Sequence, residues 1–320
     1  MTAHPFAAAP RSYLYVPGNR AGMLRKAVTR GADALIVDLE DAVPESGKAA
    51  ALALVRSWLD ERKAARAADP RGPHLTPDVW IRVNEGERGR EESAHLAGPV
   101  VTGFCLAKCA GVEEVAAQHA VLTSVEERHG LPPGTFALAP LLETAAAVLD
   151  ARQIAQAPRV RHLQLGEADL CAELGISAPD ASDPDGAAAG SALTAIRTGI
   201  LLASAAAGLL PPVGPVSTDF TDLDALARTT RALRGLGYRS RACIHPGQLA
   251  TVHDVFTPSS QEVAEAQALL ERFDAATRAG SGVITGPGGR MVDEAVVRAA
   301  RRVLASRRPA GPRQDPKETA

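Results

Sequence analysis

Aromatic residues and net charge are both scarce in this chain. Phe, Trp and Tyr make up 3% of its 320 residues, and the formal net charge is -2. A surface that binds nucleic acid usually carries a basic patch together with aromatic side chains on which bases stack. We therefore expect no nucleic-acid partner.

Paired cysteines and long hydrophobic runs are absent as well. The four cysteines form no CxxC pair and no zinc-type spacing, which favours reduced core residues: Cys105, Cys109, Cys171 and Cys243. The longest apolar run, residues 200–213, is too short to span a bilayer, and residues 1–10 lack a basic region followed by an apolar core. We expect a soluble cytoplasmic protein without a membrane partner.

Short apolar segments alternate with helix-forming segments along most of the chain. Eight such segments are typical of buried strands: residues 13–16, 32–38, 79–83, 100–107, 136–142, 161–165, 213–220 and 241–245. Eight strands that alternate with helices over about 250 residues predict an α/β fold, the (β/α)8 TIM barrel. A doubly wound sheet that binds dinucleotides would open with a glycine-rich turn after its first strand, and that turn is absent.

The expected domain organisation follows from these segments. We assign residues 12–256 to the barrel and residues 257–307 to a C-terminal helical extension that acts as a lid. We expect residues 1–11 to form a disordered lead and residues 308–320, which are charged and rich in proline, to form a disordered tail.

Two acidic residues follow neighbouring strands of the expected barrel. Glu143 comes directly after residues 136–142, and Asp169 comes shortly after residues 161–165. The segment between them is rich in alanine, so the two strands lie parallel and their carboxyl ends meet at one edge. Like charges at short range raise each other's pKa, and a hard cation with oxygen ligands removes the repulsion. The pair predicts a Mg²⁺ site.

Other polar residues fall at or just beyond the ends of expected strands, the face on which barrel enzymes build their active sites: Asp38, Glu40, Asp41, Arg82, Lys108 and His245. The three acids could support water molecules on the metal or cap the next helix. Arg82 could contact substrate or form a salt bridge, and His245 could contact substrate or orient a loop. Lys108 could be a Schiff-base lysine, a role that a metal pair makes redundant.

Several short motifs occur in order along nearly the whole chain: YVPGNR at 15–20, DLEDAV at 38–43, RVN at 82–84, ETA at 143–145, GEADL at 166–170, IHP at 244–246 and GRMVD at 289–293. In these motifs the chain resembles the β-subunit of citrate lyase and the malyl-CoA and citramalyl-CoA lyases, which belong to the HpcH/HpaI aldolase superfamily. The resemblance implies a TIM barrel that binds Mg²⁺ through Glu143 and Asp169.

The resemblance also implies roles for residues that carry no metal. It assigns Arg82 to the carboxylate or carbonyl oxygens of the substrate and Asp293 to a catalytic acid on a lid that reaches a neighbouring subunit. It assigns six further positions to the CoA thioester and its binding site: Tyr15, Arg20, Lys26, Ala168, Ile244 and His245. By the same resemblance, we expect a homotrimer or a hexamer.

The function we expect is a Mg²⁺-dependent carbon–carbon lyase. It would cleave a 3-hydroxyacyl-CoA into acetyl-CoA and a 2-oxo acid, or form the 3-hydroxyacyl-CoA from these two. The partners are therefore small molecules. One alternative is a CoA-independent class II aldolase that uses pyruvate, and another is a non-catalytic subunit that binds an acyl thioester. Malyl, citramalyl and citryl groups differ by a methyl or a carboxylate, so all three stay open, as do free CoA and a carrier protein.

Overall fold

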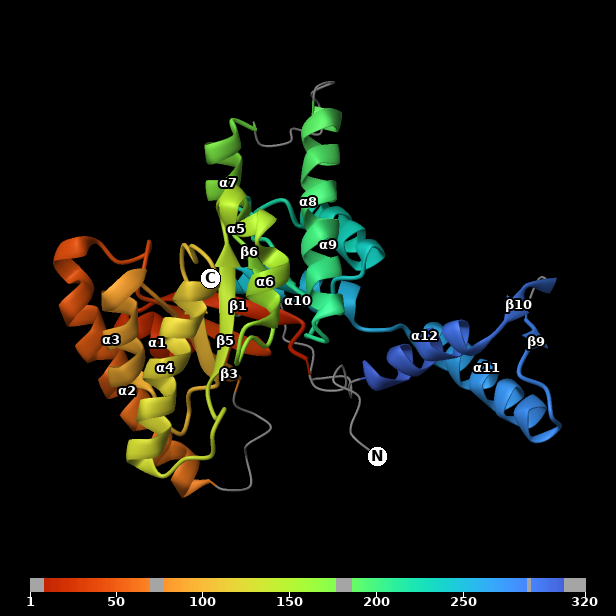
Figure 1. Ribbon diagram of the computed structural model, residues 1–320, viewed down its shortest axis with the longest axis horizontal. Helices are drawn as coiled ribbons and strands as arrows, with labels where there is room; N and C mark the ends of the chain where they lie inside the picture. The colour runs from red at the N-terminus through yellow and green to blue at the C-terminus, as the bar shows by residue number, and fades with distance from the viewer. Residues whose placement is uncertain (1–8, 70–76, 177–185, 287–288, 308–320) are drawn as a thin grey trace. The chain divides into compact units, whose positions relative to one another are not determined.

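The computed structural model describes residues 9–69, 77–176, 186–286 and 289–307. Eight parallel strands close into a barrel in sequence order, and β1 pairs with β8 to complete the ring, which confirms the TIM barrel (Figure 1). The strands are β1 (Ser12–Pro17), β2 (Ala34–Asp38), β3 (Asp78–Val83), β4 (Gly103–Leu106), β5 (Ala137–Leu142), β6 (Gln164–Leu165), β7 (Val213–Gly214) and β8 (Ser240–Cys243).

Helices join successive strands and surround the ring. They are α1 (Ala21–Ala27), α2 (Lys48–Ala68), α3 (Gly86–Leu96), α4 (Val112–His129), α5 (Ala145–Leu149), α6 (Ala151–Gln156), α7 (Glu167–Leu174), α8 (Gly186–Ala206), α9 (Leu223–Leu236) and α10 (Leu249–Phe256). Short 3-10 helices, η1 (Glu45–Gly47) and η3 (Pro246–Gln248), precede α2 and α10. Because helices cover the barrel outside and side chains fill it inside, strands such as β2 and β5 are near-continuous apolar runs.

Inward-facing side chains fill the barrel in layers. The lower layers hold mainly small or aliphatic residues around Tyr13, Trp80 and His162, whose rings pack edge to face or tilted. Burial lowers the pKa of His162 to about 3, so this ring is neutral. Above these layers, charged side chains of the barrel such as Arg82 and Asp38 lie at the carboxyl ends of their strands.

A second compact unit follows the barrel and begins within α10. It contains α11 (Ser260–Arg278), the antiparallel strands β9 (Ile284–Thr285) and β10 (Met291–Val292), and α12 (Glu294–Ala305). Phe273, Val292 and Val297 form its small core. The expected lead and tail lie almost entirely outside the described residues.

The barrel departs from the sequence expectation mainly in element lengths. The seventh strand is two residues long instead of the expected eight, because the chain leaves the ring after Gly214. The alanine-rich segment between β5 and β6 forms two short helices, α5 and α6, which meet at the non-helical Asp150. No helix among the described residues is long and apolar enough to cross a membrane.

A buried ion pair ties α4 to the amino-terminal edge of the barrel. Arg159 donates two hydrogen bonds of 2.6 Å to the carboxylate of Glu126, and both side chains are less than 5% exposed. Glu126 also accepts the backbone N–H groups of Gly134 and Phe136, so it fixes the loop that leads into β5. Removing the arginine would leave a buried carboxylate without its cation.

We expect Arg159→Met to lower the free energy of unfolding by about 3–5 kcal/mol, because Glu126 would remain buried and uncompensated. Chemical denaturation monitored by circular dichroism measures this change. Arg128→Met removes an exposed arginine from α4, the helix that carries Glu126, and is the matched control. A loss below about 1 kcal/mol, as is typical of exposed pairs, would contradict the assignment.

Candidate active site

Arg82 lies at the centre of an ion-pair network at the carboxyl ends of β2 and β3. Its Nε and Nη2 donate to the two carboxylate oxygens of Asp38 at 2.8 and 2.6 Å. Its Nη1 lies 3.1 Å from Glu40 and 3.2 Å from Asp41. Although burial opposes the charged form, hydrogen bonds and the charge of Asp38 raise the pKa of Arg82, which stays a cation.

This network leaves Arg82 with little freedom. A planar guanidinium held on two edges by carboxylates cannot rotate, so its direction is fixed before any substrate arrives. Nη2 carries two hydrogens and makes one hydrogen bond among the described residues, so one N–H remains for another oxygen. The ring of Tyr15, near the end of β1, lies under the guanidinium with its centroid 5.2 Å from Cζ.

Lys108 follows β4 and connects two parts of the site. Its Nζ lies 2.7 Å from Glu40, and its backbone N–H donates to the carboxylate of Glu143. The backbone of Lys108 is left-handed, with φ of 47°, a strained conformation for a residue with a side chain. Its hydrogen bond to Glu40 raises the pKa of Lys108, so the amine is charged and unsuited to Schiff-base formation.

Glu143 lies after β5 and is 3% exposed. The pKa of Glu143 is raised to about 7. Burial is the main cause, and the charge of Asp169 in the first turn of α7 contributes to the shift. Gly166 permits this packing, since a Cβ there would lie 2.6 Å from Oε2 of Glu143. The structure thus brings Glu143 and Asp169 together, as the strand order predicts.

The donor set fits Mg²⁺. Two carboxylates at the barrel mouth, one buried and one exposed, offer oxygen ligands and leave positions for water or substrate. The described residues contain no group of three or more His, Cys, Asp or Glu side chains that could hold a metal ion, so the candidate ligands are this pair. Repulsion within the pair is what a bound cation would relieve.

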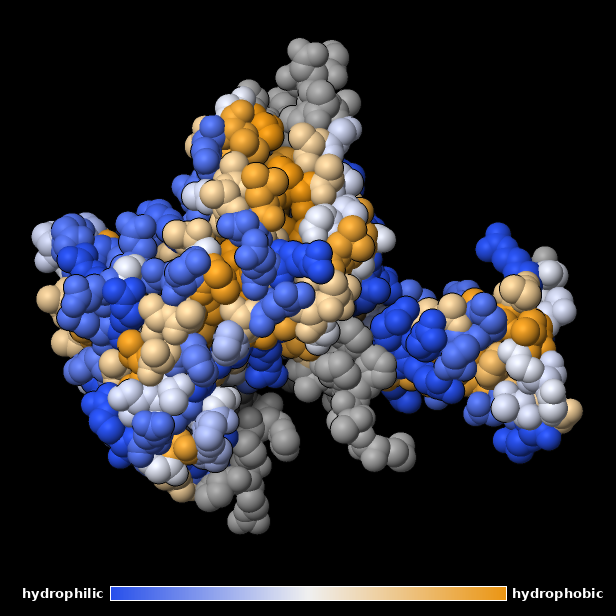
Figure 2. Space-filling model, in the orientation of Figure 1, coloured by the Kyte–Doolittle hydropathy of each residue, from blue (hydrophilic) through white to orange (hydrophobic). Residues whose placement is uncertain are grey.

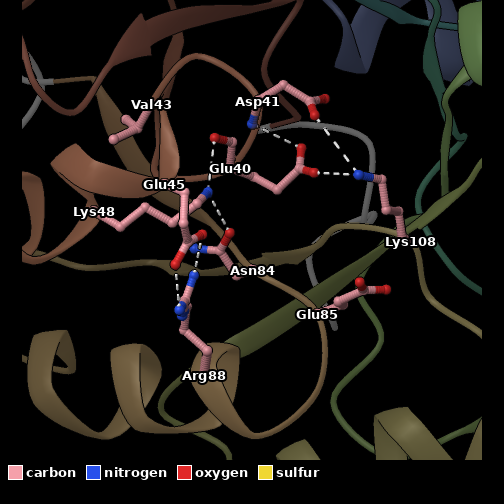
Figure 3. Close-up of a pocket in the computed structure, with 9 residues that line it drawn as sticks. All are labelled: Glu40, Asp41, Val43, Glu45, Lys48, Asn84, Glu85, Arg88 and Lys108. Atoms are coloured by element: carbon pink, nitrogen blue, oxygen red, sulfur yellow. Dashed lines mark hydrogen bonds and ion pairs between the residues drawn. The ribbon is translucent and has the colours of Figure 1, made fainter.

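A cavity of about 590 Å³ adjoins this network over the ends of β2 and β3 (Figure 3). It shares Glu40, Asp41 and Lys108 with the network. On its other side, the Lys48 amine donates to the backbone carbonyls of Leu39 and Glu40 and to the side-chain oxygen of Asn84. All three acceptors are neutral oxygens. The cavity is therefore a polar space beside the Arg82 network, and Lys108 is the lining residue that also contacts Glu143.

The residues assigned to CoA lie in β1 and in the segments that follow β1, β6 and β8. Arg20 and Lys26 are exposed at the start and end of α1, and Ala168 is exposed in α7. Ile244 is exposed, and the ring of His245 stacks on Phe220 with centroids 5.1 Å apart. β1 and β8 are hydrogen-bonded neighbours, so the loops that carry four of these residues begin side by side.

Asp293 lies in the second compact unit. Its side chain accepts the backbone N–H groups of Ala295 and Val296 at the start of α12, which makes it an N-cap. The structure therefore gives Asp293 a structural function, and its role as an acid in a neighbouring subunit stays a prediction.

Two polar residues near the site did not stand out in the sequence. Gln248 is buried and accepts the backbone N–H groups of Ile244 and His245, which shapes the loop after β8. Gln164 is buried in β6 and donates to the hydroxyl of Tyr15. Asn84, the last residue of the RVN motif, follows β3, and its side-chain oxygen accepts a hydrogen bond from Lys48. A polar residue inside an apolar strand is the signal that points to Gln164.

Fold and site together define a barrel enzyme with a carboxylate pair and a fixed arginine at its mouth. A family model described as HpcH/HpaI aldolase/citrate lyase matches residues 11–246. The chain belongs to this family.

Individual relatives cover nearly the whole chain. A citrate lyase subunit beta-like protein of Deinococcus radiodurans is 33% identical over 92% of this chain and 96% of its own length. A (3S)-malyl-CoA thioesterase of Cereibacter sphaeroides is 32% identical over 95% of both chains. The solved structure of CitE from Mycobacterium tuberculosis with magnesium, acetoacetate and coenzyme A superposes with a TM-score of 0.70, at 28% identity over 94% of this chain and 98% of that one.

The raised pKa of Glu143 predicts a pH dependence of stability for the metal-free protein. The folded protein binds this proton more tightly than the unfolded chain, whose carboxyl has a pKa of 4.5. The stabilisation is therefore complete below about pH 4.5 and is lost as the pH rises through about 7. Between pH 5 and pH 8, wild type should lose about 2–3 kcal/mol relative to Glu143→Gln, which carries no charge.

Urea denaturation of both proteins in EDTA at pH 5 and pH 8 measures this difference. Glu61→Gln, an exposed carboxylate on α2, should show no such pH-dependent gap. A constant difference between wild type and Glu143→Gln at both pH values would refute the raised pKa.

Proposed function

We propose that the chain is a Mg²⁺-dependent carbon–carbon lyase that cleaves or forms a 3-hydroxyacyl-CoA. The observation that supports this most is the Glu143–Asp169 pair beside Arg82 at the barrel mouth. Membership of a family of aldolases and citrate lyases supports the reaction class. The magnesium, acetoacetate and coenzyme A that CitE binds support the cofactor and the type of substrate.

In the cleavage of a 3-hydroxyacyl thioester, a base takes the proton of the C3 hydroxyl and the bond between C2 and C3 breaks in a retro-Claisen reaction, which leaves a 2-oxo acid and the enolate of acetyl-CoA. Held by Glu143 and Asp169, Mg²⁺ would supply Lewis-acid polarisation of the 2-oxo acid oxygens. Arg82 would direct its remaining N–H at the oxygen on which charge develops, and its fixed position means that little reorganisation accompanies the reaction. Asp38, Glu40 and Asp41 would keep that arginine in place and orient water near the metal.

The acetyl-CoA enolate needs a proton at carbon. We assign this step to Asp293 in the C-terminal extension, residues 257–307, which would close as a lid on a neighbouring subunit. Tyr15, Arg20, Lys26, Ala168, Ile244 and His245 would hold the thioester and the CoA. The exposed cations Arg20 and Lys26 suit the phosphates of CoA, whereas a CoA-independent aldolase would not use them.

A thioesterase is a second candidate, because one relative carries that name. Both reactions begin from the same bound thioester, but they break different bonds. A lyase releases acetyl-CoA and a 2-oxo acid, whereas a thioesterase adds water at the thioester carbonyl and releases free CoA with the hydroxy acid. The products therefore separate the two activities, and a non-catalytic subunit would release neither.

We expect the purified protein to release acetyl-CoA and a 2-oxo acid from at least one of malyl-, citramalyl- and citryl-CoA when Mg²⁺ is present. EDTA and Glu143→Ala should each abolish this release, and Arg82→Lys should lower kcat about 100-fold because lysine cannot reproduce the fixed planar donor. Product analysis by liquid chromatography measures all three effects. Glu61→Ala is the matched surface control.

Two outcomes would count against this proposal. Turnover that persists in EDTA and in Glu143→Ala would remove the metal from the mechanism. Release of free CoA without a 2-oxo acid would replace the lyase by the thioesterase.

The homotrimer or hexamer is also a proposal, supported by the surface of the barrel unit. An apolar area lies over α5, α7 and α8 (Figure 2), and these helices carry three exposed leucines: Leu149, Leu174 and Leu202. Such patches on soluble proteins usually mark contact surfaces.

Introducing a charge into this area should shift the protein toward smaller species. We expect Leu202→Glu, at a side chain 64% exposed, to reduce the mass measured by light scattering, because a carboxylate would be buried at the interface. Ala64→Glu on α2 adds the same charge outside this area and should leave the mass unchanged. Equal masses for all three proteins would exclude this surface as the interface.

A further inference from the structure

Tyr15 and Gln164 together form a polar floor across the barrel, beneath the mouth. Gln164 is 2% exposed, and its Nε2 donates to the Tyr15 hydroxyl at 2.7 Å. The Tyr15 ring reaches from that hydrogen bond to the underside of Arg82, so this side chain connects β6 with β3. Tyr15 as a residue is partly exposed, whereas its hydroxyl end lies against the buried Gln164.

The direction of this hydrogen bond determines what Tyr15 can do. A hydroxyl has one hydrogen and two lone pairs. Because Gln164 donates, it occupies a lone pair of the Tyr15 oxygen and leaves the hydroxyl hydrogen for another acceptor.

Two further observations fit a donor at this position. Burial raises the pKa of Tyr15, so the phenol keeps its hydrogen throughout the pH range in which enzymes work. The other N–H groups of Arg82 are directed at Asp38, Glu40 and Asp41, so one N–H on Nη2 is left among the described residues. A single N–H is a weak site for a developing oxyanion, and a second donor beside it would complete such a site.

We propose that Tyr15 donates a hydrogen bond to the substrate oxygen that Arg82 also contacts, and that Gln164 is the positioning residue that directs the Tyr15 hydroxyl toward it. This inference rests on the proposed function, because it assigns a role within that same site. Tyr15 would then be a catalytic residue as well as a wall of the thioester site. Gln164 would touch no substrate and would act only through Tyr15.

Kinetics of a double-mutant cycle test this proposal. Tyr15→Phe should lower kcat about 100-fold with little change in KM, because the donor acts where charge develops. Gln164→Met, which keeps the volume and removes the N–H, should lower kcat about 10-fold. The double variant should have the same kcat as Tyr15→Phe, because Gln164 acts through the hydroxyl alone. If Gln164 had only an independent structural effect, the two reductions in kcat would multiply.

Tyr13→Phe is the matched control, since it removes a hydroxyl from the same strand one layer deeper in the barrel. We expect its kcat to stay within about twofold of wild type. A wild-type kcat in Tyr15→Phe, or fully multiplicative effects in the double variant, would overturn the proposal.

A second measurement does not depend on turnover. The chain has three tyrosines, so labelling with tyrosine enriched in ¹³C at Cζ gives three assignable signals by nuclear magnetic resonance. The Tyr15 signal should move in Gln164→Met and, in wild type, on addition of Mg²⁺ with pyruvate and acetyl-CoA. A Tyr15 signal that responds to neither change would overturn the proposal.

The two measurements separate this inference from the proposed function. If wild type cleaves no thioester, the lyase fails as a proposal, and the response of the Tyr15 signal to Gln164→Met and to ligand then decides the inference. If wild type is an active lyase and Tyr15→Phe is equally active, the lyase stands and the inference fails.

Discussion

The site depends on the pairing of Asp38 with Arg82. These residues are direct register partners on β2 and β3, so the barrel places their Cα atoms side by side before their side chains meet. A guanidinium and a carboxylate of matching geometry then form two parallel hydrogen bonds in a buried position. Breaking such a pair would leave an uncompensated charge in the barrel, and this cost keeps Arg82 in one orientation.

Around this pair, the balance of charge favours a cation. Among the described residues, the ion pairs of Asp38, Glu40 and Asp41 are made with two cations, Arg82 and Lys108, and Glu143 and Asp169 lie nearby. Asp38 and Glu40 are each neutralised by a partner at 2.7 Å or less, whereas Glu143 receives only a backbone N–H from Lys108. The raised pKa of Glu143 is the physical result, and a divalent ion is the species that would compensate it.

Lys108 shows how a strained backbone can serve two purposes at once. Its left-handed conformation turns the amide toward Glu143 while the side chain extends to Glu40 on the neighbouring network. The position of Glu143 and the position of Arg82 are thereby coupled through one residue. The sequence marked Lys108 only as a polar residue after a strand, because a φ value depends on the fold around it.

Much of the fold and part of the site could be predicted from the sequence. Apolar runs with polar ends determined the strands, and parallel strand order determined that Glu143 and Asp169 would meet at one edge. Strand lengths were overestimated, as in residues 213–220, because apolar residues continue past the point where the chain leaves the ring. Gln164 is a polar residue in an apolar strand, but its role could not be predicted because its partner Tyr15 lies on a distant strand.

The sequence and the tertiary structure therefore determine different features of this protein. The sequence by itself determined the barrel, the face that carries the chemistry and the residue types at that face, since these follow from hydrophobic patterning and chain order. Only the tertiary structure decided which polar groups pair. Asp38 with Arg82, Lys108 with Glu40 and Gln164 with Tyr15 are contacts between distant segments, and they arise from the register and closure of the whole ring.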